Sequence, residues 1–468
     1  MTIFFGVLVL GNEAADQRLD LDLMSRSVIP IAGETIFWTD SAIALGQKTV
    51  HNTPNPGNEA LPYHRHENNL TIAGDIRLDN RAELFAALCI SQQAQNNYGD
   101  ARLILAAYHK WGEYFPEHLL GDFSFVLWDG TGQKLFCCVD HFGTRGLFYY
   151  YNGKKFIFGS TPNQLLAVKD VTPVINKNKL SILASPAAGL LFGDESWFEN
   201  IHPVPSATIL TIDKNGIRKR KYWTPQLGRE LSFKNEADYA EAFRDVLFRA
   251  VGDRLRSDYP VTALLSGGLD SSAVVSVAAK ILEKQNKELQ VFSAVLPDEH
   301  DPLLNDERYF IDRFKSFVNV KINYIAAPGS GFFSNVEELA TTVFSPNIIS
   351  RHYLNKAFVE QANTLNSRVI LEGGGGELGA SCYANGGYAE WFLKLRWPRL
   401  MSEFKSRKTL TGETYKGNLY YNVLRPIMPG LFNESRQVKL NPLKEKKALI
   451  KNLWLEKLPK NLDAPFCM

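Results

Sequence analysis

The segment with the clearest capacity for chemistry is Ser266-Gly267-Gly268-Leu269-Asp270-Ser271-Ser272. Apolar residues 261–265 precede it as a short predicted strand, and residues 273–284 follow it as a predicted helix. The two glycines let backbone N–H groups approach an anion, and the N-terminus of the helix adds the positive end of its dipole. The three serines supply hydroxyl donors. The segment, SGGLDSS, therefore predicts a cradle for phosphate or pyrophosphate.

The carboxylate of Asp270 restricts the phosphate chemistry. The segment has no lysine and does not match the GxxxxGK(S/T) pattern, so it is not built for transfer of a γ-phosphate. A carboxylate repels phosphate unless a divalent cation such as Mg²⁺ lies between them. The plainer alternative is a glycine turn in which Asp270 caps the following helix.

Helices and strands alternate around this segment. Residues 237–256 predict an amphipathic helix, residues 261–265 a strand, residues 273–284 a helix and residues 289–296 another strand. This alternation indicates a parallel, doubly wound sheet. The SGGLDSS segment joins a strand of that sheet to a helix.

The first 200 residues are instead rich in predicted strands, with few helices. Strands are expected at Ile3–Leu10, Glu34–Thr39, Leu70–Ala73, Ser124–Trp128, Lys134–Val139, Phe148–Tyr151 and Lys155–Phe158, and helices at Asn80–Cys89 and Asp100–Trp111. Asn152-Gly153 predicts a two-residue hairpin, and Asp100 a helix cap. Cys137 and Cys138 are adjacent in a strand, so we expect them to pack on opposite faces. Prolines and charges gather after Pro203, which suggests domains over residues 1–205 and 236–468 joined by a linker over residues 206–235.

The composition is that of a globular protein. The chain has 468 residues, 45% of them hydrophobic, and a formal net charge of +2. Its five cysteines form no CxxC pair, which fits a reducing compartment. No basic n-region precedes the apolar start, and no apolar run approaches the roughly 20 residues that span a bilayer. We expect a cytoplasmic protein that binds neither nucleic acid nor membrane, and its oligomeric state stays open.

The SGGLDSS segment resembles the pyrophosphatase loop of the N-type ATP pyrophosphatases, which cleave ATP between its α- and β-phosphates and adenylate a substrate. The remaining chain resembles the asparagine synthetase branch of that superfamily. The resemblance is carried by AGDIRLDNRAEL (residues 73–84), GDARLILAAYHKWG (99–112), the long segment over residues 119–151 and LEGGGGELGASCY (371–383). It covers nearly the whole chain.

This resemblance implies an α/β fold with an N-terminal Ntn-hydrolase-like αββα sandwich and a C-terminal doubly wound, parallel-sheet ATP-pyrophosphatase domain. It implies ATP and Mg²⁺ as cofactors, with the metal held by Asp270 and Glu377. These two residues and Lys457 are the implied catalytic groups, although Lys451 and Lys460 are equally placed candidates. The implied ATP-binding residues are Leu265, Ser266, Gly267, Gly268, Leu269, Asp270, Ser271, Ser272, Ser293, Ala294, Gly373 and Gly374.

Two departures in the N-terminal domain argue against glutamine hydrolysis. Members that hydrolyse glutamine carry a cysteine after the initiator methionine, where this chain has Thr2, and an unactivated hydroxyl is a far weaker nucleophile than a thiol. The family's Asn-Gly-Glu segment is Ala73-Gly74-Asp75 here. Asp100 stands where an acidic residue would bind the glutamine amino group. The sequence predicts an inactive sandwich; the alternative is Thr2 as an N-terminal threonine nucleophile.

The second glycine-rich loop also departs from the family pattern. The loop usually ends in Asp-Glu, but the Asp is Gly376 here, so only Glu377 of that pair remains to bind the metal. The run Gly373–Gly376 is expected to bring backbone close to adenine and ribose, and a simple flexible turn is the alternative. Glu307 follows the second predicted strand and is a candidate for contacting substrate or metal. The short stretch after this loop suggests a truncated C-terminus.

Loss of the glutaminase is typical of members whose nucleophile is already an amine, namely the β-lactam synthetases and the lasso-peptide cyclases. Residues 373–397 resemble the latter more closely, which implies a peptide substrate, a leader-peptide-binding protein and a protease as partners. The first alternative is an asparagine synthetase that uses free ammonia and aspartate. The second, from a different class, is a nucleotide-binding pseudoenzyme or a truncated remnant.

Overall fold

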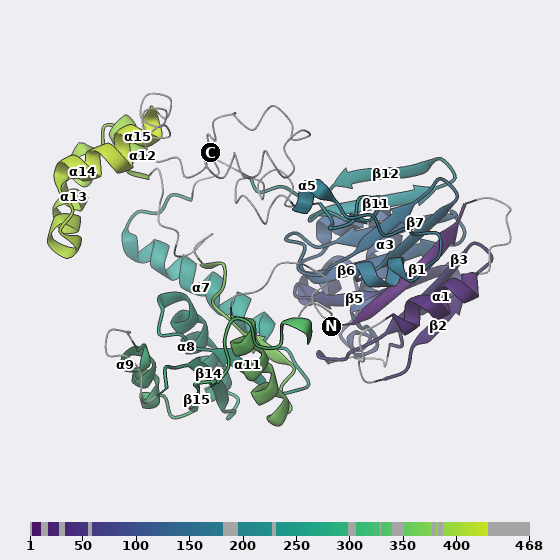
Figure 1. Ribbon diagram of the computed structural model, residues 1–468, viewed down its shortest axis with the longest axis horizontal. Helices are drawn as coiled ribbons and strands as arrows, with labels where there is room; N and C mark the ends of the chain where they lie inside the picture. Colours follow the sequence, from purple (N-terminus) through teal and green to yellow (C-terminus); the bar gives the residue numbers. More distant parts are fainter. Residues whose placement is uncertain are drawn as a thin grey trace. The chain divides into compact units, whose positions relative to one another are not determined.

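The computed structural model describes residues 2–10, 17–27, 33–54, 59–180, 195–226, 231–297, 306–327, 329–338, 351–376, 381 and 387–428. The chain forms two compact units, Met1–Glu372 and Gly373–Met468. The first unit contains a sandwich of antiparallel sheets and a separate parallel sheet, and the second unit is helical where it is described (Figure 1).

The sandwich consists of two six-stranded antiparallel sheets. The first sheet has the order β10-β8-β9-β1-β3-β2, with β10 His202–Pro203, β8 Phe148–Tyr151, β9 Lys155–Gly159, β1 Ile3–Val9, β3 Ile43–Lys48 and β2 Ile36–Thr39. The second has the order β12-β11-β7-β6-β5-β4, with β12 Gly216–Lys221, β11 Thr208–Asp213, β7 Lys134–Val139, β6 Gly121–Asp129, β5 Leu70–Leu78 and β4 Tyr63–Arg65. The predicted hairpin at Asn152-Gly153 is confirmed, since it joins β8 to β9.

Period-2 alternation along the strands builds three apolar layers. Phe4 packs with Trp128 between the two sheets, while Phe5 faces the outer side of the first sheet with α1 (Gln17–Arg26) and α4 (Pro162–Leu166). Cys137 joins the core between the sheets, and Cys138 faces α2 (Arg81–Ala87) and α3 (Asp100–Trp111) on the outer side of the second. The αββα sandwich and the opposed cysteines are therefore confirmed.

The N-terminus of α3 is capped from a distance. Asp100 is not the cap that the sequence predicted, because Gly99 occupies the N-cap position. The carboxylate of Glu59 instead accepts hydrogen bonds from the backbone N–H groups of Ala101, at 3.2 Å, and Arg102, at 3.0 Å. Burial raises the pKa of Glu59, and the two backbone bonds act in the opposite direction. The acidic residue that caps α3 thus lies 41 residues before Asp100 in the sequence. The side chain of Asp100 is therefore available for other contacts.

The predicted linker over residues 206–235 is wrong in its first half. Strand β11 pairs with β7 from Thr208↔Val139 to Ile212↔Leu135, and β12 extends the sheet by one more strand. The prolines near residue 203 suggested a break, but Pro203 ends the short edge strand β10, where a missing N–H is tolerated. The sandwich therefore continues to at least Lys221.

Tyr222, directly after β12, gives a test of this extended sandwich. Its hydroxyl donates to the carbonyl of Val139 at 2.8 Å, and burial raises its pKa. Tyr222→Phe leaves that buried carbonyl one donor short, so we expect a loss of about 1–2 kcal/mol in the free energy of unfolding, measured in urea. Tyr114→Phe is the control, because Tyr114 is 62% exposed. Equal stabilities of the two variants would contradict the packing of residue 222 in the sandwich.

The parallel sheet has the order β15-β14-β13-β16, with β15 Val320–Ile325, β14 Leu289–Ala294, β13 Val261–Leu264 and β16 Val369–Leu371. One apolar cluster joins it to α7 (Glu236–Arg254), α8 (Leu269–Glu283) and α9 (Arg308–Ile311). A second cluster, around Phe292 and Phe358, covers the other face with α11 (His352–Thr364). Helices on both faces confirm the doubly wound, parallel arrangement.

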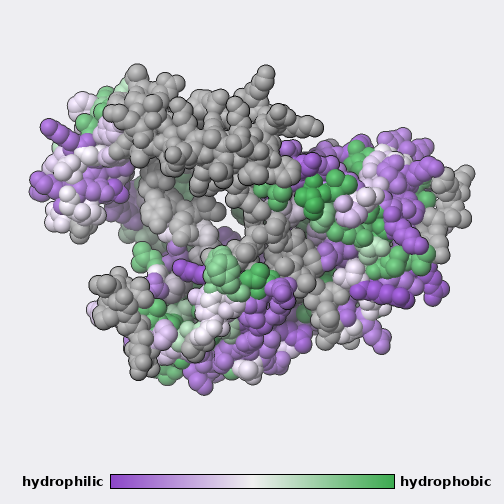
Figure 2. Space-filling model, in the orientation of Figure 1, coloured by the Kyte–Doolittle hydropathy of each residue, from purple (hydrophilic) through white to green (hydrophobic). Residues whose placement is uncertain are grey.

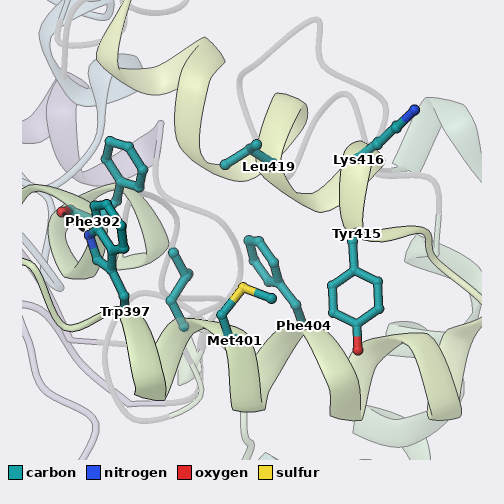
Figure 3. Close-up of a pocket in the computed structure, with 8 residues that line it drawn as sticks. Phe392, Trp397, Met401, Phe404, Tyr415, Lys416 and Leu419 are labelled. Atoms are coloured by element: carbon teal, nitrogen blue, oxygen red, sulfur yellow. Dashed lines mark hydrogen bonds between the residues drawn. The ribbon is translucent and has the colours of Figure 1, made fainter.

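The second unit is a small helical cluster. It contains α12 (Gly387–Leu393), α13 (Trp397–Thr411), α14 (Tyr415–Leu419), the π-helical turn Tyr420–Leu424 and α15 (Arg425–Ile427). Leu400, Phe404 and Val423 are buried at its centre. An apolar pocket of about 260 Å³ lies between α13 and α14, and Figure 3 shows Met401, Phe404 and Tyr415 along it while Lys416 extends away.

The surface mixes polar and apolar residues. In Figure 2, hydrophilic and hydrophobic side chains are interspersed over the visible face of the described regions. Within the ranges described, no helix combines the length and the apolar character needed to cross a bilayer.

Candidate active site

The SGGLDSS loop begins where β13 ends. Leu265 is 1% exposed, and its N–H donates to the carbonyl of Phe292 at 2.9 Å, so it extends the pairing with β14. Leu265 is therefore a packing residue that fixes the start of the loop. From Ser266 onward the chain leaves the sheet, and Leu269 is 85% exposed.

Gly267 adopts a conformation that favours glycine. Its φ is +77°, in the left-handed region. A Cβ added at this position would lie 3.0 Å from the Cβ of Phe310 and 3.5 Å from the carbonyl oxygen of Glu307. The loop is thus closely covered by the residues that begin α9. Glu307, which the sequence offered as a substrate or metal contact, does lie beside the loop.

Serine hydroxyls brace the loop internally. The hydroxyl of Ser271 lies 3.0 Å from that of Ser266, accepts the backbone N–H of Ser266 at 3.2 Å and donates to the carbonyl of Gly268 at 3.3 Å. Ser271 is 7% exposed, so its hydroxyl holds the shape of the turn. Binding of phosphate by Ser266 and Ser272 stays a prediction.

Helix α8 starts earlier than the sequence suggested. It begins at Leu269 and takes Asp270, Ser271 and Ser272 into its first turns. Its N-cap position is Gly268, and no side-chain hydrogen bond caps it. The alternative in which Asp270 caps the helix is therefore wrong. The first backbone N–H groups of α8 and the half-buried Asp270 carboxylate lie together at the end of β13, which suits a phosphate bridged by a divalent cation.

The neighbouring strand brings the other predicted residues to the same edge. Pairing of Leu264 with Phe292 sets Ser293 and Ala294 at the carboxyl end of β14, level with the start of the loop. Ser293 is fully buried, and its hydroxyl has no hydrogen-bond partner within the described part of the chain. Its contact with nucleotide stays a prediction.

The sequence did not single out Asp306 and Arg308, which flank Glu307. Arg308 donates to the carbonyl of Leu296 at 2.7 Å, just after β14. Asp306 accepts the backbone N–H of Arg308 at 2.7 Å, while its second carboxylate oxygen lies 3.5 Å from the guanidinium. This pair ties the start of α9 to the end of β14. The only signal in the sequence was its position soon after a predicted strand.

The remaining predicted residues fall in or beyond the second glycine-rich loop. Gly373 and Gly374 follow β16 in sequence and begin the second compact unit. Glu377 and Lys457, together with Lys451 and Lys460, lie outside the described residues. Among the residues that the structure describes, no group of three metal-ligating side chains gathers. The oxygen chemistry of Asp270 fits Mg²⁺, and the metal pair Asp270–Glu377 stays a prediction.

In the sandwich, the hydroxyl of Thr2 is hydrogen-bonded to the backbone. Thr2 is 4% exposed, and its hydroxyl accepts the N–H of Val50 at 3.1 Å and lies 3.4 Å from the carbonyl of the same residue. The nearby carboxylate of Asp75 has its pKa raised by burial, against the effect of Arg145 at 3.7 Å. This arrangement gives Thr2 no base that takes its proton at hydrogen-bond distance among the described side chains.

We therefore expect no glutamine hydrolysis above the uncatalysed rate. A hydroxyl that is hydrogen-bonded to the backbone of Val50 is a far weaker nucleophile than a thiol near neutral pH. Glutamate release from glutamine is the measurement, with a glutamine-hydrolysing asparagine synthetase as positive control. Turnover that Thr2→Ala abolishes would show that the sandwich is an active glutaminase after all.

Comparison with known families separates the chain into two matched regions. Residues 32–223 match the model of a glutamine amidotransferase domain, and residues 242–457 match that of asparagine synthase. The two regions together span most of the chain, in the order that the sandwich and the parallel sheet have in the structure.

Curated relatives agree with these matches. The chain is 33% identical over 225 residues to asparagine synthetase [glutamine-hydrolyzing] 3 of Bacillus subtilis, covering 46% of this chain and 35% of that protein. It is 32% identical over 204 residues to putative asparagine synthetase [glutamine-hydrolyzing] 2 of Methanocaldococcus jannaschii, covering 43% and 39%. Amidase chry2 of Gibberella zeae is 26% identical over 277 residues, covering 53% and 37%.

The chain thus spans little more than a third of the length of these relatives. Strands β2 to β12 of the sandwich fall within the first matched region, and the parallel sheet and the SGGLDSS loop between β13 and α8 fall within the second. Taken together, the two matched regions and these relatives show that the chain is similar to the asparagine synthetase family.

Proposed function

We propose that the protein is an ATP-dependent carbon–nitrogen ligase that adenylates a carboxylate, releases pyrophosphate and passes the acyl group to an amine. The observation that carries this proposal is the SGGLDSS loop at the carboxyl end of β13. Its glycine turn and the uncapped N-terminus of α8 offer backbone N–H groups to phosphate. Adenylate formation leaves AMP and pyrophosphate as products.

Each residue of the proposed site has a distinct task. The N–H groups from Gly267 to Ser271 bind the phosphates, and Gly373 and Gly374 bind the nucleoside. Asp270, with Glu377, holds Mg²⁺, which when bound offsets negative charge on the pyrophosphate. Lys457 stabilises the charge that develops during adenylation.

The amine is proposed to come from the substrate itself. The occupied hydroxyl of Thr2 supports a sandwich that generates no ammonia. An amine tethered to the activated acid reacts at high effective concentration and requires no channel. We therefore assign macrolactam formation in a lasso-type peptide, with a leader-peptide-binding protein and a protease as partners.

Mass spectrometry of a genetically linked precursor peptide tests this function. The peptide is incubated with enzyme, ATP, Mg²⁺ and the linked protease. The cyclised product has lost one water, and AMP and pyrophosphate appear in equal amounts. A peptide of unchanged mass in the presence of AMP formation would refute the cyclisation.

The names of the first two relatives favour a second candidate, an asparagine synthetase. Aspartate, ammonia and ATP would then yield asparagine while the peptide stays unchanged. The replacement of the family's Asp by Gly376 favours a third, a nucleotide-binding pseudoenzyme. Absence of ATP–pyrophosphate exchange with either substrate would select it.

A further inference from the structure

A cluster of arginines joins the parallel sheet to the sandwich. Arg254, the last residue of α7, donates to the carboxylates of Asp79 and, at 2.9 Å, Asp122. Asp79 follows β5 and Asp122 lies in β6, so both carboxylates belong to the sandwich. Their side chains are 6% and 17% exposed. One guanidinium therefore bridges two largely buried acids of the other fold.

Arg256 makes a second attachment two residues later. Its guanidinium lies 3.0 Å from the carboxylate of Asp100 and 2.8 Å from the carbonyl oxygen of Leu78. The same carboxylate accepts the N–H of Leu78 at 3.0 Å and is paired with Arg81. Asp100 therefore shares its charge between the sandwich and the segment that leads into β13.

The sandwich also contributes an arginine to these contacts. Arg77, in β5, donates to the backbone carbonyls of Asp253 and Arg256 and holds Asp79 at 3.1 Å. Burial lowers the pKa of Arg77, and Asp79 opposes that effect. The carbonyl of Asp253 lies in the last turn of α7, where no N–H four residues later belongs to the helix, so Arg77 supplies it with a side-chain donor.

A third set of contacts reaches the start of β16. Arg368, which immediately precedes β16, donates to the carbonyl of His51 at 2.9 Å and lies over the ring of Tyr259 at 3.8 Å. Ser257 donates to the carbonyl of Asn52 at 3.0 Å. Strands β13 and β16 are parallel neighbours, so the sandwich holds the amino ends of both.

These contacts lie at the amino ends of β13 and β16, and the two glycine-rich loops follow the carboxyl ends of the same strands. The carboxyl end of β13 carries the SGGLDSS loop, and β16 is followed by the second glycine-rich loop. Strands β13 and β16 have four and three residues, so little chain separates each fastened end from its loop. A strand of this length transmits displacement because its neighbours are close-packed.

We infer that Arg254, Arg256 and Arg77 are positioning residues of the proposed ligase site. They fix β13 and β16 against the sandwich and thereby hold the SGGLDSS loop in its binding conformation. The sandwich therefore supports the ATP site structurally, and this role does not depend on glutaminase activity. This inference rests on the proposed function for its catalytic consequence, while the coupling itself can be measured without activity.

Arg254→Gln is the primary variant, because it removes the charge between two acids and keeps a side chain of similar length. The matched control is Arg220→Gln. Arg220 pairs with Glu117 at 2.6 Å inside the sandwich and has nearly the same exposure, 36% against 39%. Arg254→Lys serves as the conservative variant, since one ammonium keeps the charge but lacks the fork that reaches both carboxylates.

Hydrogen exchange followed by mass spectrometry is measured at a temperature where every variant is folded. We expect faster exchange of the peptide over residues 261–272 in Arg254→Gln, an intermediate rate in Arg254→Lys and no change in Arg220→Gln. Exchange of β7, Lys134–Val139, is the internal reference. Unchanged exchange of residues 261–272 in Arg254→Gln would overturn the inference.

Titration with Mg·ATP adds the functional readout. A coupling of ordinary size predicts a dissociation constant raised on the order of tenfold in Arg254→Gln. Loss of thermal stability with an unaltered dissociation constant would reduce the cluster to a structural contact and refute the positioning role. If the variants show the expected exchange pattern but the wild-type protein binds no Mg·ATP, the proposed ligase function is refuted and the structural coupling is upheld.

Discussion

Asp270→Asn is expected to lower the rate of ATP-dependent pyrophosphate release on the order of a thousandfold, which corresponds to about 4 kcal/mol in the activation free energy. The carboxylate lies in the first turn of α8, among backbone N–H groups that attract phosphate. A charge of that sign would favour phosphate binding there only with Mg²⁺ between the carboxylate and the phosphates. The neutral amide of asparagine has nearly the same shape and loses the metal.

The measurement is ATP–pyrophosphate exchange with the carboxylate substrate, run across a range of Mg²⁺ concentrations. Asp238→Asn is the matched control, since Asp238 also lies half-exposed in the first turn of a helix, α7. Both variants lose the small dipole stabilisation of an acid at a helix start, roughly 0.3–1 kcal/mol. Near-normal exchange in Asp270→Asn would show that the SGGLDSS loop is not the ATP site.

Gly267→Ala is expected to weaken Mg·ATP binding by roughly tenfold or more. A φ of +77° costs an alanine about 1–2 kcal/mol, and the new Cβ would lie 3.0 Å from the Cβ of Phe310. Neither atom is the end of a flexible side chain, so the loop or the start of α9 must shift. Displacement of the loop moves the N–H groups that are proposed to bind phosphate.

The control is Gly252→Ala, in helix α7. A Cβ at that position meets only the Cδ1 of Ile281, at 3.6 Å, and alanine has the higher helix propensity. Titration calorimetry with Mg·ATP compares the two variants, and thermal unfolding records their stability. If both bind like the wild type, the positive φ of Gly267 has no part in shaping the nucleotide site.

The candidate site was predictable to the extent that it is local in sequence. A glycine turn between an apolar strand and a helix is encoded within 12 residues, from Val261 to Ser272. The boundary of α8 was wrong by four residues, because Leu269 and Asp270 are compatible with either loop or helix. The covering of Gly267 by Glu307 and Phe310 depends on a second strand–helix connection and could not be seen in the motif.

The local patterns of the sequence determined that the first region is rich in strands and that the second contains a parallel sheet. Period-2 alternation specifies strands such as β7 with opposed faces at Cys137 and Cys138, and the strand–helix alternation after residue 236 specifies a parallel sheet. These patterns are local, because each is set by the direction in which neighbouring side chains point.

Only the tertiary structure decided how distant segments are joined. Strand β11 was placed in the sandwich by its pairing with β7, the cap of α3 came from Glu59, and Arg254 bridged Asp79 and Asp122 across more than 130 residues. A charged side chain has the same local pattern whether it meets water or a buried partner. Its partner is therefore fixed by the packing of two folds, where an acid removed from water requires a cation or hydrogen-bond donors.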